Sequence, residues 1–243
     1  IRYFDSSLLP SINVIIGEAK KRYGLNFTAH QSYMIKEGGN SIHIQLVEGM
    51  DNEAYSLEIL PHKIICKASG KAGIFYGLQS LLQLISIDNK KAAAPCVVIN
   101  DKPLYPWRGY MLDISRHFFG KETVKQYLDV MASLKLNRFH WHLTDEQAWR
   151  IEIKKYPKLT EIGSSGSWSD VDAPHAFYTQ EDIKEVVAYA AERNIMVITE
   201  IDMSGHATAI RRSYPEISLS LIPISEPTRR YAITYAVFLI KNL

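Results

Sequence analysis

The alternation of strand-like and helix-like segments in the second half of the chain constrains the fold most. Three β-rich runs are separated by two stretches whose apolar residues recur with helical spacing: runs 108–115, 137–145 and 195–203, stretches 121–136 and 179–194. Thr179, with Asp182 three residues on, is typical of a helix start. Such repeated units predict a parallel sheet with crossover helices. Both an open doubly wound sheet and a (β/α)8 barrel fit.

The first hundred residues follow a different pattern. Short β-rich runs are followed by a stretch with helical spacing of apolar residues: runs 12–19, 41–47, 54–60 and 63–69, helical stretch 72–86. This order predicts a small α+β domain over residues 1–102. Pro103 and Pro106 mark a boundary to a second domain over residues 103–218.

Composition excludes several classes of protein. The net charge of +2 is too small, and the basic residues too scattered, for nucleic-acid binding. Two cysteines, Cys66 and Cys96, form no disulfide framework. No apolar run approaches the ~20 residues that a membrane span needs. The chain starts at Ile1 and shows no basic-then-apolar leader, so we expect no signal peptide within it. The oligomeric state does not follow from these features.

Acids and bases stand at the end of each of the three predicted strands. They are Asp113, Arg116 and His117 after the first, His140, His142, Asp145 and Glu146 after the second, and Glu200, Asp202 and His206 after the third. In a barrel, the carboxyl ends of the strands meet on the face that carries the chemistry. No Gly-rich phosphate loop follows the first strand, which disfavours nucleotide binding.

Several of these residues have two interpretations. His140 and His142 are two apart on a strand and face the same way, so with Asp145 and His206 they could assemble a zinc site. A neutral, hydrogen-bonded histidine pair is the alternative that we favour, and we expect no metal and no other cofactor. Arg116 either pairs with a buried Asp113 or binds a ligand.

The pairing of Asp145 with His206 is more suggestive, because a carboxylate beside an imidazole can tune a third, protonatable group. Two tryptophans, Trp149 and Trp168, fall in loops at the same end of the predicted strands. Their rings could stack on a sugar or could anchor their loops.

Three segments, "RGYMLDISRHF", "NRFHWHLTDEQAWRIEIKKYPKL" and "ITEIDMSGHATA", occur in that order. Together they resemble glycoside hydrolase family 20, the β-N-acetylhexosaminidases, and the resemblance covers about residues 1 to 217. It implies an α/β fold in which a small α+β domain precedes an incomplete (β/α)8 TIM barrel with about three of its eight units. It also implies an exported bacterial enzyme that acts on glycans ending in N-acetylglucosamine or N-acetylgalactosamine.

The resemblance also implies roles for single residues. Arg116 would bind hydroxyls of the terminal sugar, Asp145 would pair with His206 to tune the general acid, and Asp202 would support the same loop. Enzymes of this family retain the anomeric configuration without an enzyme nucleophile, because the substrate's acetamido oxygen attacks the anomeric carbon. An adjacent Asp-Glu pair orients that acetamido group and protonates the leaving oxygen.

That catalytic pair is missing from this chain. No Asp-Glu dipeptide follows residue 203, and Asp145-Glu146 belongs to the second strand's motif. We therefore expect the chain as given to be inactive, with a non-catalytic carbohydrate-binding or unfolded fragment as the alternative and a metal-dependent barrel hydrolase as the third choice. The tail over 219–243 breaks the pattern, and "SEPTRRYAITYAVF" resembles a translated sequencing adapter, so we expect this tail not to be native.

Overall fold

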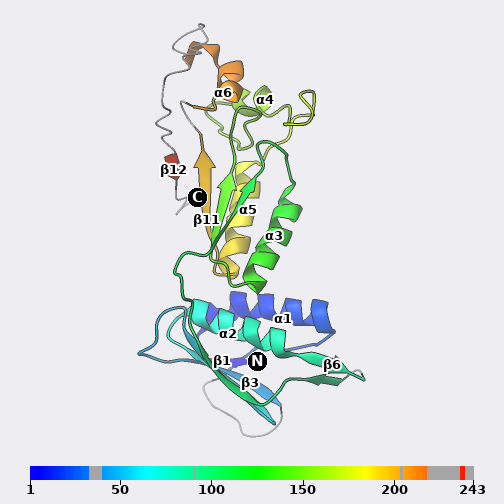
Figure 1. Ribbon diagram of the computed structural model, residues 1–243, viewed down its shortest axis with the longest axis vertical. Helices are drawn as coiled ribbons and strands as arrows, with labels where there is room; N and C mark the ends of the chain where they lie inside the picture. The colour runs from blue at the N-terminus through cyan, green and yellow to red at the C-terminus, as the bar shows by residue number, and fades with distance from the viewer. Residues whose placement is uncertain (33–39, 90, 203–204, 218–235, 239–243) are drawn as a thin grey trace. The chain divides into compact units, whose positions relative to one another are not determined.

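The computed structural model describes residues 1–32, 40–89, 91–202, 205–217 and 236–238 (Figure 1). They form two compact units. Unit 1 comprises Ile1–Arg108, Met131–Asn137 and Ala191–Asn194, and unit 2 comprises Gly109–Val130, Arg138–Ala190 and Ile195–Leu243. In the described part of the chain no helix is long and apolar enough to cross a membrane.

Unit 1 contains a six-stranded mixed sheet in the order β2-β1-β3-β5-β4-β8. The strands are β1 (Arg2–Tyr3), β2 (His30–Gln31), β3 (Ser41–Leu46), β4 (Tyr55–Leu60), β5 (Lys63–Ala68) and β8 (Val97–Asp101). A separate hairpin pairs β6 (Ser86–Asp88) with β7 (Lys91–Ala93). After a short 3-10 turn, η1 (Ser6–Leu8), come α1 (Leu9–Tyr23) and later α2 (Lys71–Leu84), which packs against α1, β4 and β5.

The predicted strand over 12–19 is wrong, because these residues lie inside α1. Ile12, Ile15 and Ala19 are buried on one side of the helix, which is helical spacing rather than the alternation of a strand. The short β-branched run was ambiguous without its neighbours. Pro10 stands in the first turn, and Gly24 ends the helix in the left-handed conformation with φ 70°.

Helix α2 approaches the sheet closely through two glycines. A Cβ atom at Gly73 would lie 2.3 Å from the carbonyl oxygen of Ala54, and one at Gly77 would lie 2.5 Å from Sγ of Cys66. Since neither contact leaves room for a methyl group, the absence of side chains at these positions sets the distance between helix and sheet. Burial among these atoms raises the pKa of the Cys66 thiol to about 12.

Unit 2 is built on the predicted strand–helix alternation, which is confirmed. The parallel strands β9 (Gly109–Asp113), β10 (Arg138–His142) and β11 (Met196–Ile201) lie side by side, with β10 in the middle. Strand β12 (Ala236–Phe238) pairs antiparallel with β11. The rest of the tail that we expect not to be native lies outside the described residues.

The connecting helices of unit 2 are α3 (Lys121–Ser133) and α5 (Gln180–Glu192), and Figure 1 shows both alongside the strands. They contact each other, because Lys121 Nζ lies 2.8 Å from Asp182 Oδ1. The predicted start of α5 is confirmed: Thr179 Oγ1 accepts from the Asp182 amide at 3.1 Å, and the Asp182 carboxylate accepts from the Thr179 amide and hydroxyl. Shorter elements follow the strands: α4 (Lys158–Glu161), α6 (Thr208–Ser213) and η2 (Pro215–Ile217).

Candidate active site

The strand register gathers the polar residues at the carboxyl end of the unit 2 sheet. His142, the last residue of β10, is opposite Asp113 on β9 and opposite Glu200 on β11. The three side chains therefore start from one row across three neighbouring strands. His140 lies two residues earlier on β10 and faces the same side. The strand ends predicted to meet do meet.

Asp145 is the centre of this cluster. Its side chain is only 2 % exposed, and three basic side chains approach it. Arg116 Nη2 lies 2.6 Å and His142 Nε2 2.9 Å from Oδ2, while His206 Nδ1 lies 3.1 Å from Oδ1. The Glu146 amide also donates to Oδ1 at 2.6 Å. Burial acts to raise the pKa of Asp145, but the hydrogen bonds from His142 and the Glu146 amide and the charge of Arg116 outweigh it, and the pKa is lowered.

His142 lies between two carboxylates. Its Nε2 lies 2.9 Å from Asp145, and its Nδ1 lies 2.8 Å from Oε2 of Glu200, an ion pair whose N–H is not aligned for a hydrogen bond. Burial alone would lower the pKa of His142, yet Asp145 and Glu200 raise it to about 9. The raised pKa of His142 opposes the neutral pair of His140 and His142 that we favour from the sequence, and that pair stays a prediction. The same oxygen of Glu200 also lies 2.6 Å from Nε2 of His140.

Arg116 pairs with Asp113, as the first of its two predicted interpretations requires, and ligand binding by Arg116 stays a prediction. Its Nη1 donates to Asp113 Oδ2 at 2.7 Å and lies 3.1 Å from His142 Nε2, while Nη2 reaches Asp145. Asp113 also accepts from the backbone amide of Arg116 at 3.1 Å. About a third of the arginine side chain, 31 %, remains exposed. Carboxylates thus fix the guanidinium while part of the Arg116 side chain stays exposed.

Asp202 follows β11 and faces the same cluster. Its amide donates to Thr144 Oγ1 at 2.8 Å, which ties the end of β11 to the loop after β10. Burial, with the charges of Glu200 and Asp145, raises the pKa of Asp202 even though His142 opposes the shift. In the part of the chain that the structure describes, the buried Oδ1 atom of Asp202 has no hydrogen-bond partner. Asp202 can therefore still accept a hydrogen bond.

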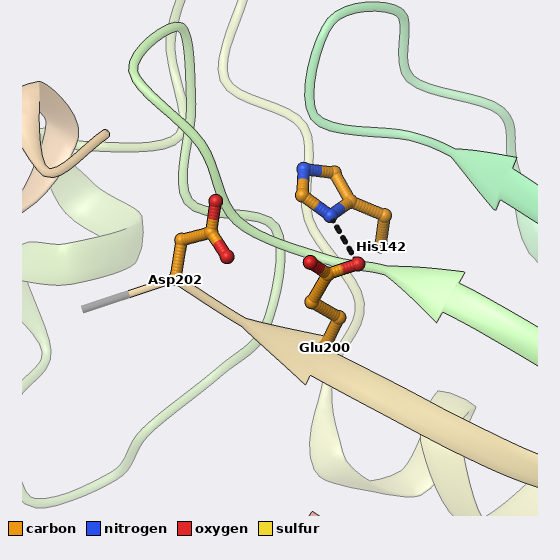
Figure 2. A group of neighbouring side chains, drawn as sticks. All are labelled: His142, Glu200 and Asp202. Atoms are coloured by element: carbon orange, nitrogen blue, oxygen red, sulfur yellow. Dashed lines mark ion pairs between the residues drawn. The ribbon is translucent and has the colours of Figure 1, made fainter. Parts of the chain in front are cut away.

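The group His142, Glu200 and Asp202 could also hold a cation, since each offers one ligand atom and these lie within 4.8 Å of one another. Figure 2 shows the His142 ring paired with Glu200 and the Asp202 carboxylate beside them. Metal binding requires a neutral imidazole. The pKa of about 9 means that His142 would have to lose a proton that Asp145 and Glu200 stabilise, which opposes a metal here. Of the four residues in the predicted zinc site, this group contains only His142.

His206 completes the Asp145 cluster from the segment before α6. Its backbone has φ 50°, a left-handed conformation that is uncommon outside glycine. The side chain is 46 % exposed although Nδ1 contacts the buried Asp145. An imidazole that contacts a carboxylate through one nitrogen can use its other nitrogen to contact a third group and so change the pKa of that group. The predicted pair is therefore present as a contact, and its tuning role stays a prediction.

The two loop tryptophans differ. Trp149 is buried and donates its indole N–H to the Ile151 carbonyl at 2.6 Å, so it anchors its loop. Trp168 is 70 % exposed, and its backbone amide donates to the carbonyl of Arg116 at 2.8 Å. Trp168 thus remains able to stack on a sugar. His117, in contrast, lies away from the cluster and bonds to Ser169 at 3.1 Å.

Two important residues were not singled out from the sequence. Glu200 was placed at a strand end without a role, yet it pairs with both histidines of β10. Arg150 lies inside the quoted second-strand motif and is 1 % exposed, and a buried arginine normally requires partners. No periodicity identifies such a residue, because its five donors bind backbone carbonyls that are distant in sequence.

A cavity of about 350 Å³ lies in unit 1. It is lined by Arg2, Asp5 and His43 among others and includes none of the site residues.

Comparisons with known proteins indicate one family. Residues 105–238 match the glycosyl hydrolase family 20 catalytic domain, and residues 13–102 match domain 2 of the same family. A β-hexosaminidase from Porphyromonas gingivalis is 43 % identical over 189 residues, which is 74 % of this chain and 24 % of that protein. One from Akkermansia muciniphila is 44 % identical over 175 residues, covering 71 % of this chain and 36 % of its own length.

A solved structure agrees as well. The exo β-N-acetylglucosaminidase from Vibrio harveyi, crystallised with N-acetylglucosamine, superposes with a TM-score of 0.81 at 33 % identity, covering 90 % of this chain and 35 % of that one. The predicted fold, a small α+β domain followed by an incomplete (β/α)8 barrel, is confirmed. The chain spans about a quarter to a third of the curated relatives' length. By its two domain matches and its relatives, the chain belongs to glycosyl hydrolase family 20.

Proposed function

We propose that the protein containing this chain is a β-N-acetylhexosaminidase that removes terminal, non-reducing N-acetylglucosamine or N-acetylgalactosamine from glycans. The observation that carries the proposal is the buried Asp145 carboxylate, which contacts both Arg116 and His206 at the carboxyl ends of the strands of a family 20 chain. The relatives that match are named as hexosaminidases, which supports the same activity.

In this proposal the described residues act on the sugar without forming a bond to it. Arg116, held by Asp113 and Asp145, would donate to hydroxyls of the terminal sugar. The substrate's acetamido oxygen would attack the anomeric carbon and give an oxazolinium ion, while a general acid protonates the leaving oxygen. Asp145 and His206 would keep that acid protonated near neutral pH by holding charge beside it. Asp202 would support the loop between them.

The test is carried out on the complete gene product. A hexosaminidase hydrolyses 4-nitrophenyl N-acetyl-β-glucosaminide, and retention predicts that the β-anomer of the free sugar appears first by NMR. Because the acetamido oxygen is the nucleophile, the matched substrate without the acetyl group should not react. Hydrolysis of both substrates at similar rates, or release of the α-anomer first, would contradict the substrate-assisted mechanism.

We further propose that the 243 residues alone do not hydrolyse glycosides, because no Asp-Glu pair follows residue 203 to orient the acetamido group and protonate the leaving oxygen. Sugar binding through Arg116 is the alternative for this chain. Titration with N-acetylglucosamine, followed by NMR of the arginine side chains, tests this alternative. Signals that shift with the sugar concentration would show binding, and unchanged signals would show none. Turnover by the 243-residue chain would contradict the proposal.

That the tail over 219–243 is not native remains a prediction. Long-read sequencing of the source DNA across the codons for Tyr214 to Leu243 tests it. A reading frame that continues after Ile217 into further strand–helix units with an Asp-Glu pair would support an artefactual tail. The same tail followed by a stop codon in the genome would contradict it.

A metal-dependent hydrolase is the third candidate, and it rests on the grouping of His142, Glu200 and Asp202. Elemental analysis of the purified gene product separates the two classes. Stoichiometric zinc, with loss of activity on chelation, would favour the metal enzyme over the proposed glycosidase.

We also propose that the protein acts outside the cytoplasm, where large glycans are accessible to it. Fractionation of the source cells, with hexosaminidase activity measured in each fraction, tests this proposal. Activity confined to the cytoplasmic fraction would overturn it.

A further inference from the structure

Arg150 is a buried arginine whose guanidinium donates hydrogen bonds to backbone carbonyl groups and lies 5.7 Å from the centre of the Phe118 ring. It is 1 % exposed, and among the described residues no carboxylate pairs with it. Its guanidinium makes five hydrogen bonds: Nε to Ile114 at 3.2 Å, Nη1 to Ser164 at 2.5 Å and Ala176 at 3.0 Å, and Nη2 to Ser115 at 3.1 Å and Gly166 at 2.6 Å. Every donor of the planar fork is thus used.

The five acceptors belong to two segments. Ile114 and Ser115 connect the end of β9 directly to Arg116. The other three acceptors lie in the loop over 163–178, which leads into α5 and carries Trp168. The two segments also touch each other, because the Trp168 amide donates to the Arg116 carbonyl at 2.8 Å. Arg150 therefore lies where the Arg116 segment and this loop meet.

Two backbone hydrogen bonds hold Arg150 itself in place. Its amide donates to the Leu143 carbonyl at 3.0 Å, and its carbonyl accepts from the Tyr178 amide at 2.8 Å. Burial lowers the pKa of Arg150 to about 10, which still leaves it protonated at neutral pH. Lysine could not replace it, since an ammonium has three donors at one point, whereas the fork spreads five across two segments.

We propose that Arg150 is the positioning residue for Arg116: by binding the carbonyls of Ile114 and Ser115 together with those of the 163–178 loop, it fixes where the Arg116 guanidinium meets the sugar. This inference rests on the proposed function only where it concerns the sugar. Arg150 itself does not touch the substrate. Its loss releases the segment before Arg116 and the loop that carries Trp168.

Hydrogen exchange in the complete gene product tests the positioning without any substrate. In Arg150→Lys and Arg150→Met we expect the amides of Arg116, Gly166 and Trp168 to exchange at least ~10-fold faster, while amides of β11 and α3 change by less than about twofold. Arg212→Lys is the matched control, because Arg212 is an exposed arginine that also donates to backbone carbonyls, one of them in this loop: those of Gln147 and Ser165. Unchanged exchange near Arg116, or equal acceleration along the whole chain, would overturn the inference.

A measurement on the wild-type protein covers the case in which both variants fail to fold. If the fork is bound as described, the Nη protons of Arg150 should give separate, slowly exchanging NMR signals, while those of the exposed Arg212 average by rotation. Averaged signals for Arg150 would contradict the proposal.

Kinetics then connect the positioning to the sugar. Because Arg116 would hold the sugar in both ground and transition states, Arg150→Lys should raise KM about tenfold and change kcat by less than about threefold. A fall in kcat with KM unchanged would overturn the positioning role. If the wild type shows no hexosaminidase activity but the local exchange pattern is present, the proposed function fails and the positioning of Arg116 stands.

Discussion

At the scale of single residues, we expect substitution of Asp145 to lower the stability of the fold strongly. Asp145→Asn removes the charge that faces Arg116 and His142 in a place where the Asp145 side chain is only 2 % exposed. Because breaking a buried pair leaves uncompensated charges, we expect the free energy of unfolding of the complete gene product to fall by about 3–5 kcal/mol. Chemical denaturation measures it.

The matched control for this substitution is Asp51→Asn, whose carboxylate pairs with Lys102 but is 70 % exposed. An exposed pair contributes about 0–1 kcal/mol. Equal losses in the two variants would show that burial of Asp145 has no energetic consequence.

His142 predicts a dependence of stability on pH. Its pKa is raised from 6.5 to about 9 by Asp145 and Glu200, with Arg116 and Asp113 also facing the cluster. A raised pKa means that His142 stabilises the fold fully below pH 6.5 and that this contribution is lost as the pH rises through about 9. The free energy of unfolding, measured from pH 6.5 to about 9, should therefore fall in the wild type, and this fall should be absent in His142→Gln. An NMR titration in which His142 changes charge near pH 6.5 would disprove it.

At the scale of elements, two glycines in helices should respond to alanine in opposite directions. In α2, a methyl group at Gly77 would lie 2.5 Å from Sγ of Cys66, so Gly77→Ala should destabilise unit 1 by about 1–3 kcal/mol. In α1, nothing lies within 4 Å of a Cβ at Gly17, so Gly17→Ala should stabilise it by up to about 1 kcal/mol. Thermal melts of both variants check the signs, and a loss in both would mean that space beside the helix is not the deciding factor.

The elements also show how far the sequence could predict this structure. The strand–helix alternation was sufficient to predict β9, β10 and β11. It also predicted that their polar ends meet, because parallel strands have a fixed direction and period. The helix over 9–23 was missed, since a short β-branched run has the same composition in either structure. The charge on His142 depends on Asp145 and Glu200 together, and the role of Arg150 depends on carbonyls from two distant segments. Neither arrangement has a local pattern.

At the scale of the whole molecule, the four-stranded sheet of unit 2 ends at β9. Among the described strands β9 pairs only with β10, and its apolar side chains Tyr110 and Met111 are 38 % and 47 % exposed. An open, apolar edge of a parallel sheet favours association with other chains. We therefore expect the 243-residue chain to aggregate with rising concentration while the complete gene product does not, as light scattering would show.

A variant of this chain tests the same edge. Met111→Lys should reduce the aggregation, because a charge on an edge strand disfavours pairing. A cooperative melt of the unmodified 243-residue chain as a monomer, with unit 2 protected from protease, would refute the expectation.

The carbonyl acceptors of Arg150 have a consequence for how this part of the protein can evolve. Every amino acid has a main-chain carbonyl, so a substitution at Ser164, Ala176 or Ile114 leaves the acceptor for Arg150 in place. A guanidinium held by acidic side chains would lose an anchor with each such mutation. One arginine thus allows the loop beside Arg116 to change its sequence while the course of the loop's backbone stays the same.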